Sequence, residues 1–206
     1  MTRIPAIAYG GAAAMALAHA GFPSGPCEGL GVAIGTSGSD LGAEELSTAL
    51  VRGEEPRRAA LDTAVFGEAA LAGLNPLWLL LHLPNMASAH VAIQVEARGP
   101  NTTVMTGWAA GLSAIVEGAA WITEGSAVAV LAGGADSAVH PFAFAALEQA
   151  GLFSPPLPGT SPLVPAEGAA VVLLEEREAA LARGARILAE VGDHALAPGG
   201  RLSLLV

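Results

Sequence analysis

The sequence contains one cysteine and few charged residues. Cys27 is the only cysteine among 206 residues, which excludes an internal disulfide. Lysine and arginine number 9 against 19 aspartate and glutamate residues, and the net charge of −10 argues against binding to a phosphate backbone. The 5 histidines form no cluster with cysteine or aspartate of the kind that holds zinc. We therefore expect no nucleic-acid binding, no metal site and no cofactor.

The sequence also lacks a segment suited to crossing a membrane. The uncharged stretch 69–95 contains Pro84, and the stretch 99–116 contains a Gly-Pro pair and Gly107. No N-terminal segment combines a charged region, a long apolar region and a cleavage site. These absences lead us to expect a cytoplasmic protein that does not enter a membrane.

Hydrophobic residues, in contrast, are abundant. They make up 52% of the chain while charged residues make up 14%, so much of the surface must be uncharged. That apolar content is high for a monomer and indicates a surface that is buried against a partner. The length suits a single compact domain, which we expect to span residues 1–206.

Apolar runs alternate with helical patterns along the chain. Strands are expected at 29–36, 102–106, 128–132, 169–174 and 187–191. Helices are expected at 6–19, 44–51, 75–95 with a break at Pro84, 108–123, 142–150 and 175–183. The segment 152–165 contains five prolines and is predicted to be an ordered loop. Strands that alternate with helices imply an α/β fold with a mostly parallel sheet.

One segment has the form of an active-site turn. Arg98–Gly111, RGPNTTVMTGWAAG, combines a short strand, a tight turn at Thr106 and Gly107, and the start of a helix with Trp108 at the apex. At such a position the free backbone N–H groups and the helix dipole favour developing negative charge. Enzymes place nucleophiles there, whereas the indole of Trp108 has no nucleophilic group.

This segment resembles the active-site segment of the β-ketoacyl-acyl carrier protein synthases, a branch of the thiolase fold. In that family a cysteine accepts the acyl group at the position that Trp108 occupies here. Other motifs of the family occur in the family's order, with Ala166 in place of the first glycine of a G-E-G-A motif. They are Asn85–His90, Ala132–Ser137, Glu167–Ala169 and Leu174–Ile187.

The resemblance covers about residues 5–192, but only about half of a family member, which consists of two similar halves. Missing are the opening strand and the second half, which carries two active-site histidines in H-G-T-G-T and G-H-x-x-G-A-A-G motifs. The histidines of this chain match neither motif: His19, His82, His90, His140 and His194. The resemblance thus implies a thiolase-like layered α/β/α half-fold that lacks all three catalytic groups.

Several side chains admit more than one interpretation. Trp108 is predicted to fill a core gap, to plug the acyl tunnel or to contact a partner chain. Asp136 is expected to be a structural hydrogen-bond acceptor, although a carboxylate at a strand end is also able to act as a general base. Glu167 is interpreted as a buried acid that pairs with backbone amides. We expect His90 to be an ordinary helical histidine and Cys27 a structural thiol.

The resemblance also implies where substrate and partners would bind. Candidates for substrate contact surround the nucleophile position: Gly107, Trp108, Ala109 and Gly111. In the family, the strand before the nucleophile pairs antiparallel with its mate across the dimer. Here that strand consists of Asn101, Thr102, Thr103, Val104, Met105 and Thr106. A lone half also exposes a face that the family buries, and such burial is worth about 25 cal/mol per Å². We therefore expect a homodimer, or a heterodimer with a full-length ketosynthase.

Three functions are compatible with these residues. The first is a non-catalytic accessory subunit that pairs with an active ketosynthase in fatty-acid or polyketide assembly, in the manner of a chain-length factor. The second is a residual acyltransferase or decarboxylase that uses helix-terminal amides to stabilise an enolate. The third is a module that binds an acyl chain or an acyl carrier protein without turnover. The missing nucleophile favours the first.

Overall fold

The computed structural model describes residues 4–37, 43–55, 60–81, 83–152, 164–192, 194–197 and 201–204. These residues belong to two compact units, which we describe separately. The sheet unit is drawn from residues 3–38, 84–139 and 165–206. The helical unit is drawn from residues 1–2, 39–83 and 140–164.

A four-stranded sheet forms the centre of the sheet unit. Its strands are β1 (Leu30–Gly35), β4 (Asn101–Val104), β5 (Ala129–Ser137) and β6 (Glu167–Glu175), in the order β4-β1-β5-β6. Strand β1 runs parallel to both β4 and β5, whereas β6 runs antiparallel to β5. The predicted α/β fold with a mostly parallel sheet is therefore confirmed.

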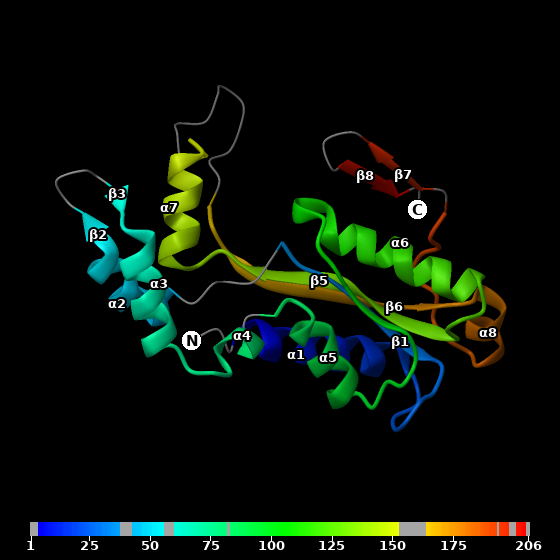
Figure 1. Cartoon of the computed structure of the whole chain (residues 1–206). Coiled ribbons are helices and arrows are strands. Elements are labelled where there is room, and N and C mark those ends of the chain that lie inside the picture. The colour runs from blue at the N-terminus through cyan, green and yellow to red at the C-terminus, as the bar shows by residue number, and fades with distance from the viewer. Residues whose placement is uncertain are drawn as a thin grey trace. The chain divides into compact units, whose positions relative to one another are not determined.

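Helices cover both faces of this sheet (Figure 1). On one face, α1 (Ile4–Ala20) contacts β5 and β6, and α5 (Met86–Gln94) contacts β1 and β4. On the other face, α6 (Ala110–Thr123) contacts β1 and β5. The remaining elements of the unit are α8 (Arg177–Ala182) and an antiparallel hairpin of β7 (His194–Ala197) and β8 (Arg201–Leu204). The arrangement has the three layers that the sequence predicts.

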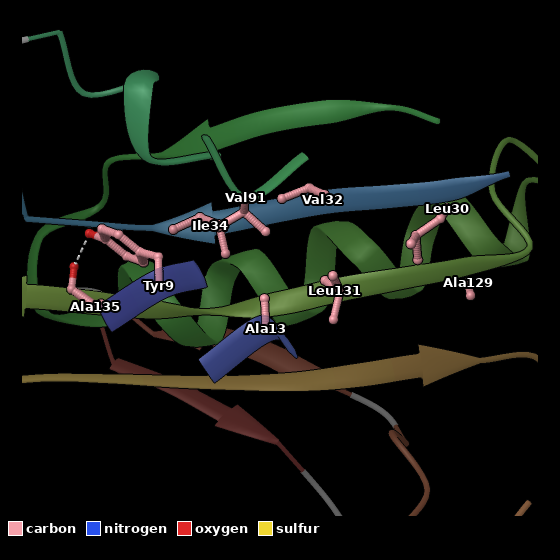
Figure 2. Packing of buried hydrophobic residues seen from close by; sticks show 9 residues of the cluster. All are labelled: Tyr9, Ala13, Leu30, Val32, Ile34, Val91, Ala129, Leu131 and Ala135. Atoms are coloured by element: carbon pink, nitrogen blue, oxygen red, sulfur yellow. Dashed lines mark hydrogen bonds between the residues drawn. The ribbon is translucent and has the colours of Figure 1, made fainter. Parts of the chain in front are cut away.

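Side-chain size differs between the two faces of β1. Leu30, Val32 and Ile34 are buried among residues of α1, α5 and β5, as Figure 2 shows. The alternate residues of β1 are Gly31, Ala33 and Gly35, which face α6. Because successive residues of a strand point to opposite faces, this alternation places the bulk on one side. Helix α6 can therefore lie unusually close to the sheet.

The helical unit contains α2 (Ala43–Gly53), α3 (Thr63–Gly73), the short α4 (Trp78–Leu81) and α7 (Pro141–Gln149). Strands β2 (Glu54–Glu55) and β3 (Ala60–Leu61) form a small antiparallel pair before α3. The Asp62 carboxylate accepts hydrogen bonds from the backbone N–H groups of Ala64 and Val65, which fixes the start of α3. Helix α3 packs against α2.

Some elements differ from the expectations. Residues 185–192 were expected to include a strand at 187–191, but they form neither strand nor helix. Strand β6 is the predicted strand at 169–174, yet it lies at an edge of the sheet and is half exposed rather than buried. Most of the expected proline-rich loop, residues 153–163, lies outside the described residues. Within the described ranges, no helix is both long and apolar enough to cross a membrane.

Candidate functional site

The candidate site lies where β4 leads into α6. The chain passes through Met105 and Thr106 and enters a short 3₁₀ helix, η1 (Gly107–Ala109), that continues directly into α6. Gly107 has a φ of 62°, a conformation that favours glycine. No side chain caps the first turns of η1 and α6. Their backbone N–H groups can therefore still favour negative charge, as the sequence predicts. The predicted strand-turn-helix is confirmed.

Close backbone contacts fix the position of this turn. A Cβ atom at Gly35 would lie 2.2 Å from the carbonyl carbon and oxygen of Ala110. A Cβ atom at Gly134 would lie 2.9 Å from the Cα of Gly111. The Thr106 and Ser113 hydroxyls are also hydrogen-bonded to each other at 3.0 Å. The start of α6 is therefore held against the ends of β1 and β5 with no space for side chains between them.

Trp108 points away from this packed base. Its side chain is 82% exposed, whereas the next residue, Ala109, is 4% exposed. An indole that fills a core gap would be buried, so the core interpretation of Trp108 is wrong. The other two interpretations, a plug of the acyl tunnel and a contact with a partner chain, stay predictions.

The four predicted substrate-contact residues share this turn but differ in access. Trp108 is exposed, Gly107 and Gly111 are half-buried, and Ala109 is buried. The Thr106 and Ser113 side chains beside the turn end in hydroxyl groups, which are not general bases at neutral pH. At the apex of the turn the structure places the Trp108 indole, and no cysteine lies among the four residues.

Asp136 has the structural role that the sequence predicts. Its carboxylate accepts a 2.8 Å hydrogen bond from the Thr36 hydroxyl and bonds of 3.0 and 2.9 Å from the backbone N–H of Ser37. These bonds join the carboxyl ends of β1 and β5. Glu167 was interpreted as a buried acid bound to backbone amides, which is wrong. It is exposed and accepts a 3.0 Å bond from the Ser137 hydroxyl.

Tyr9 is a buried residue with a hydrogen-bonded hydroxyl that the family motifs do not include. Its hydroxyl donates to the carbonyl oxygen of Ala135, which ties α1 to the end of β5 (Figure 2). Burial, reinforced by the Asp136 carboxylate, raises the pKa of the Tyr9 phenol, and a hydrogen bond with Thr36 partly offsets this rise. Tyr9 therefore remains a protonated donor. The sequence feature that could have drawn attention to Tyr9 is that it is the only tyrosine of the chain and lies in an alanine-rich helix.

His90 and Cys27 do not extend the site. His90 lies exposed on α5, while His82 falls outside the described residues. Cys27 is half-buried and forms an isolated β-bridge with Ala97. Among the residues that the structure describes, no group of three or more histidine, cysteine and acidic side chains is placed to hold a metal ion.

The predicted interface strand lies at the edge of the sheet opposite β6. Residues Asn101–Val104 form β4, and Met105 and Thr106 follow it. An open pocket of about 420 Å³ lies beside the strand and is lined by Pro84, Asn85, Ser88, Ala89, Asn101, Thr102, Thr103 and Met105. Ser88, fully buried, accepts a 2.9 Å bond from the Thr103 hydroxyl and was not singled out by the motifs.

The sheet unit is thus a three-layered α/β fold with a turn of the active-site type before α6. The family model described as "Beta-ketoacyl synthase, N-terminal domain" matches residues 11–180. The chain therefore belongs to the β-ketoacyl synthase family, through the N-terminal domain of that family.

Curated relatives agree with this assignment. Over 193 residues the chain is 34% identical to the granaticin polyketide putative β-ketoacyl synthase 1 of Streptomyces violaceoruber, covering 87% of this chain and 44% of that protein. Over 133 residues it is 35% identical to the 3-oxoacyl-[acyl-carrier-protein] synthase 2 of Synechocystis sp., covering 59% of this chain and 32% of that protein. The chain spans less than half the length of either relative.

Solved structures show the same fold. One is a type II polyketide synthase acyl-carrier protein in complex with its ketosynthase, matched with a TM-score of 0.73 at 25% identity. That match covers 94% of this chain and 48% of the other chain. Another is the ishigamide ketosynthase/chain length factor, matched with a TM-score of 0.67 at 28% identity over 91% of this chain and 45% of the other. The thiolase-like half-fold is thereby confirmed.

Proposed function

We propose that this chain is a non-catalytic ketosynthase-like subunit that pairs with an active, full-length ketosynthase in fatty-acid or polyketide assembly. The observation that carries the proposal is Trp108. It occupies the position at which the family resemblance places the nucleophilic cysteine, and its indole is 82% exposed on a rigidly packed turn. Such a residue cannot accept an acyl group but is well suited to contact another protein.

The similar proteins support an accessory role in a pair. The solved relatives include a ketosynthase with its acyl-carrier protein and a ketosynthase/chain length factor. By analogy, this chain would pair with a full-length ketosynthase, and an acyl carrier protein would be the further partner of that complex. No nucleic acid is proposed, because the net charge is −10.

We further propose that β4 forms the contact with the ketosynthase. An edge strand presents unpaired backbone N–H and C=O groups that can pair with a strand of another chain. Strand β4, NTTV, carries no charge and no proline, and both would hinder such pairing. Thr102, Thr103 and Val104 are half-buried, and Met105 is 52% exposed at the end of the strand. The pocket beside it, which has both polar and apolar walls, would accept side chains of the partner.

Charged substitutions test this contact. The protein is first purified from its own host, and the full-length ketosynthase that accompanies it is identified by mass spectrometry. Met105→Asp and Val104→Asp are then expected to weaken binding of that ketosynthase at least ~100-fold, because an unpaired charge would be buried. Binding is measured by titration calorimetry with purified components.

The matched control is Val128→Asp, which places the same charge on a side chain that is 62% exposed and lies outside β4. It should bind like the wild type. Circular dichroism checks that each variant is folded, and Met105→Asp serves if Val104→Asp unfolds. Unchanged affinity of folded Met105→Asp and Val104→Asp would show that β4 is not the contact, and absence of any ketosynthase companion would count against the accessory role.

A second prediction concerns catalysis. The wild-type protein incubated with hexanoyl-pantetheine should gain no acyl group, because the turn before α6 has no nucleophile. Intact-mass spectrometry measures this. Any acylation that persists in Cys27→Ser would contradict a non-catalytic role, whereas acylation lost in that variant would only identify slow chemistry at the half-buried thiol.

A further inference from the structure

Helix α5 carries a polar residue, Ser88, on the face that it packs against the sheet. Ser88 and Val91 are the buried residues of this helix, and both are 0% exposed. Val91 belongs to the apolar cluster around Val32 and Ile34 of β1, which Figure 2 shows. Serine forms helices less readily than alanine, and burying its hydroxyl is costly unless that hydroxyl is hydrogen-bonded. A buried serine on this face therefore requires partners for its hydroxyl.

The partners of Ser88 lie in β4 and at the start of α5. The Thr103 hydroxyl donates to the Ser88 hydroxyl at 2.9 Å, and the Asn101 side-chain amide donates to the Ser88 carbonyl oxygen at 3.1 Å. The Ser88 hydroxyl in turn donates to the carbonyl oxygen of Asn85 at 3.1 Å. Asn101 and Thr103 are two residues apart in the strand, so their side chains lie on the same face. Both of them reach this one residue of α5.

Strand β4 depends on such bonds because it is short and lies at an edge. It has four residues, and its neighbour in the sheet is β1. The open pocket beside it is lined by Ser88, Asn101 and Thr103, among others, so solvent reaches this side of the strand. Segments with few buried apolar contacts and exposed backbone hydrogen bonds open locally at little cost in free energy. The bonds to Ser88 therefore limit how far β4 can move away from α5.

We propose that Ser88 is a positioning residue for β4, whose hydroxyl holds the strand in the extended form in which its free edge pairs with a strand of the ketosynthase. The inference rests on the proposed function, which includes that contact. Ser88 is fully buried, so it acts through Thr103 and does not touch the partner. Because β4 is already held in place before the partner arrives, less conformational freedom is lost on binding.

Two substitutions remove the same hydrogen bond from opposite ends. Ser88→Ala removes the hydroxyl but keeps the backbone carbonyl that Asn101 uses, and Thr103→Val removes the hydroxyl of β4. Each should weaken binding of the purified ketosynthase about 10-fold in titration calorimetry. The double variant should bind about as well as either single variant, because both lose one shared bond. Losses that add in the double variant would overturn the proposal.

Ser126→Ala is the matched control. Its hydroxyl donates to the carbonyl oxygen of Trp121 at 3.1 Å, so one serine hydrogen bond is again lost, but Ser126 is exposed and lies outside β4 and its pocket. This variant should bind the ketosynthase like the wild type. Circular dichroism and urea unfolding check that every variant is folded, and Thr103→Val serves if Ser88→Ala unfolds.

Hydrogen exchange in the isolated chain distinguishes this inference from the proposed function. In Ser88→Ala the backbone amides of β4 should exchange at least ~10-fold faster, while those of β5 keep their wild-type rates. If no ketosynthase accompanies the wild type, the proposed function fails, and the exchange rates alone decide the role of Ser88. Wild-type exchange in β4 would overturn that role, and so would equal acceleration in β4 and β5, which indicates a general loss of stability. Wild-type affinity of folded Ser88→Ala for the ketosynthase would overturn it as well.

Discussion

Replacing Gly35 with alanine is expected to lower the free energy of unfolding by about 3 kcal/mol or to prevent folding of the sheet unit altogether. The added Cβ would lie 2.2 Å from the carbonyl carbon and oxygen of Ala110 and 2.4 Å from the nitrogen of Gly111. These are backbone atoms at the start of α6, so no side-chain rotation relieves the overlap. The helix would have to move off the sheet, and Trp108 would move with it.

Urea denaturation followed by circular dichroism measures this effect. Gly11→Ala is the matched control, because Gly11 lies in α1 of the same unit and a Cβ there would meet no heavy atom within 4 Å. That variant should gain about 0.5–1 kcal/mol from helix propensity. If Gly35→Ala unfolded at the wild-type urea concentration, α6 could not lie as close to β1 as described.

Much of the sheet unit could be predicted because local patterns and family motifs agree there. The run at 29–36 is apolar and bounded by glycines, and it forms β1. Whether a strand lies at the edge of the sheet could not be predicted, because this depends on which strands are its neighbours. Strand β6 was therefore expected to be buried. The mostly apolar run at 187–191 was expected to be a strand, although no neighbouring strand pairs with it in the described residues.

In the candidate site, too, the features set by local sequence could be predicted and those set by long-range contacts could not. The resemblance places Trp108 at a helix start, since that depends on chain-local motifs. Its exposure depends on which residues of α6 face the sheet, and this is set by contacts with β1 and β5 that are distant in sequence. Tyr9 was missed for a similar reason, because its partner Ala135 lies 126 residues away. Long-range hydrogen bonds leave no spacing signal in one sequence.

Arg183→Ala is expected to cost about 2–4 kcal/mol of unfolding free energy. The Arg183 guanidinium donates through Nε to Glu175 at 2.8 Å and through Nη2 to the other carboxylate oxygen, while Nη1 donates to the carbonyl of Ala20 at 2.8 Å. It also lies 5.7 Å from the ring centroid of Phe22. One side chain thus links the carboxyl end of α1, where carbonyl groups lack helical partners, to β6.

The size of the loss follows from burial of the partner. The Glu175 side chain is only 11% exposed, so removing Arg183 leaves a carboxylate that water cannot fully solvate. Arg183→Lys should recover only part of the loss, because lysine cannot donate to both carboxylate oxygens and to Ala20 in the same geometry. Adding Glu175→Gln to Arg183→Ala should restore part of the stability, since the uncompensated charge is then absent.

Arg177 provides a comparison with an exposed ion pair. It pairs with Glu190 at 2.9 Å, a distance close to that in the Arg183 pair, but the two side chains are 57% and 65% exposed. Arg177→Ala should therefore change stability by at most about 1 kcal/mol. Thermal and urea unfolding of both alanine variants measure the difference. Equal losses would mean that the Arg183 pair is no better shielded from water than a surface ion pair, and the end of α1 would then be held by its apolar contacts instead.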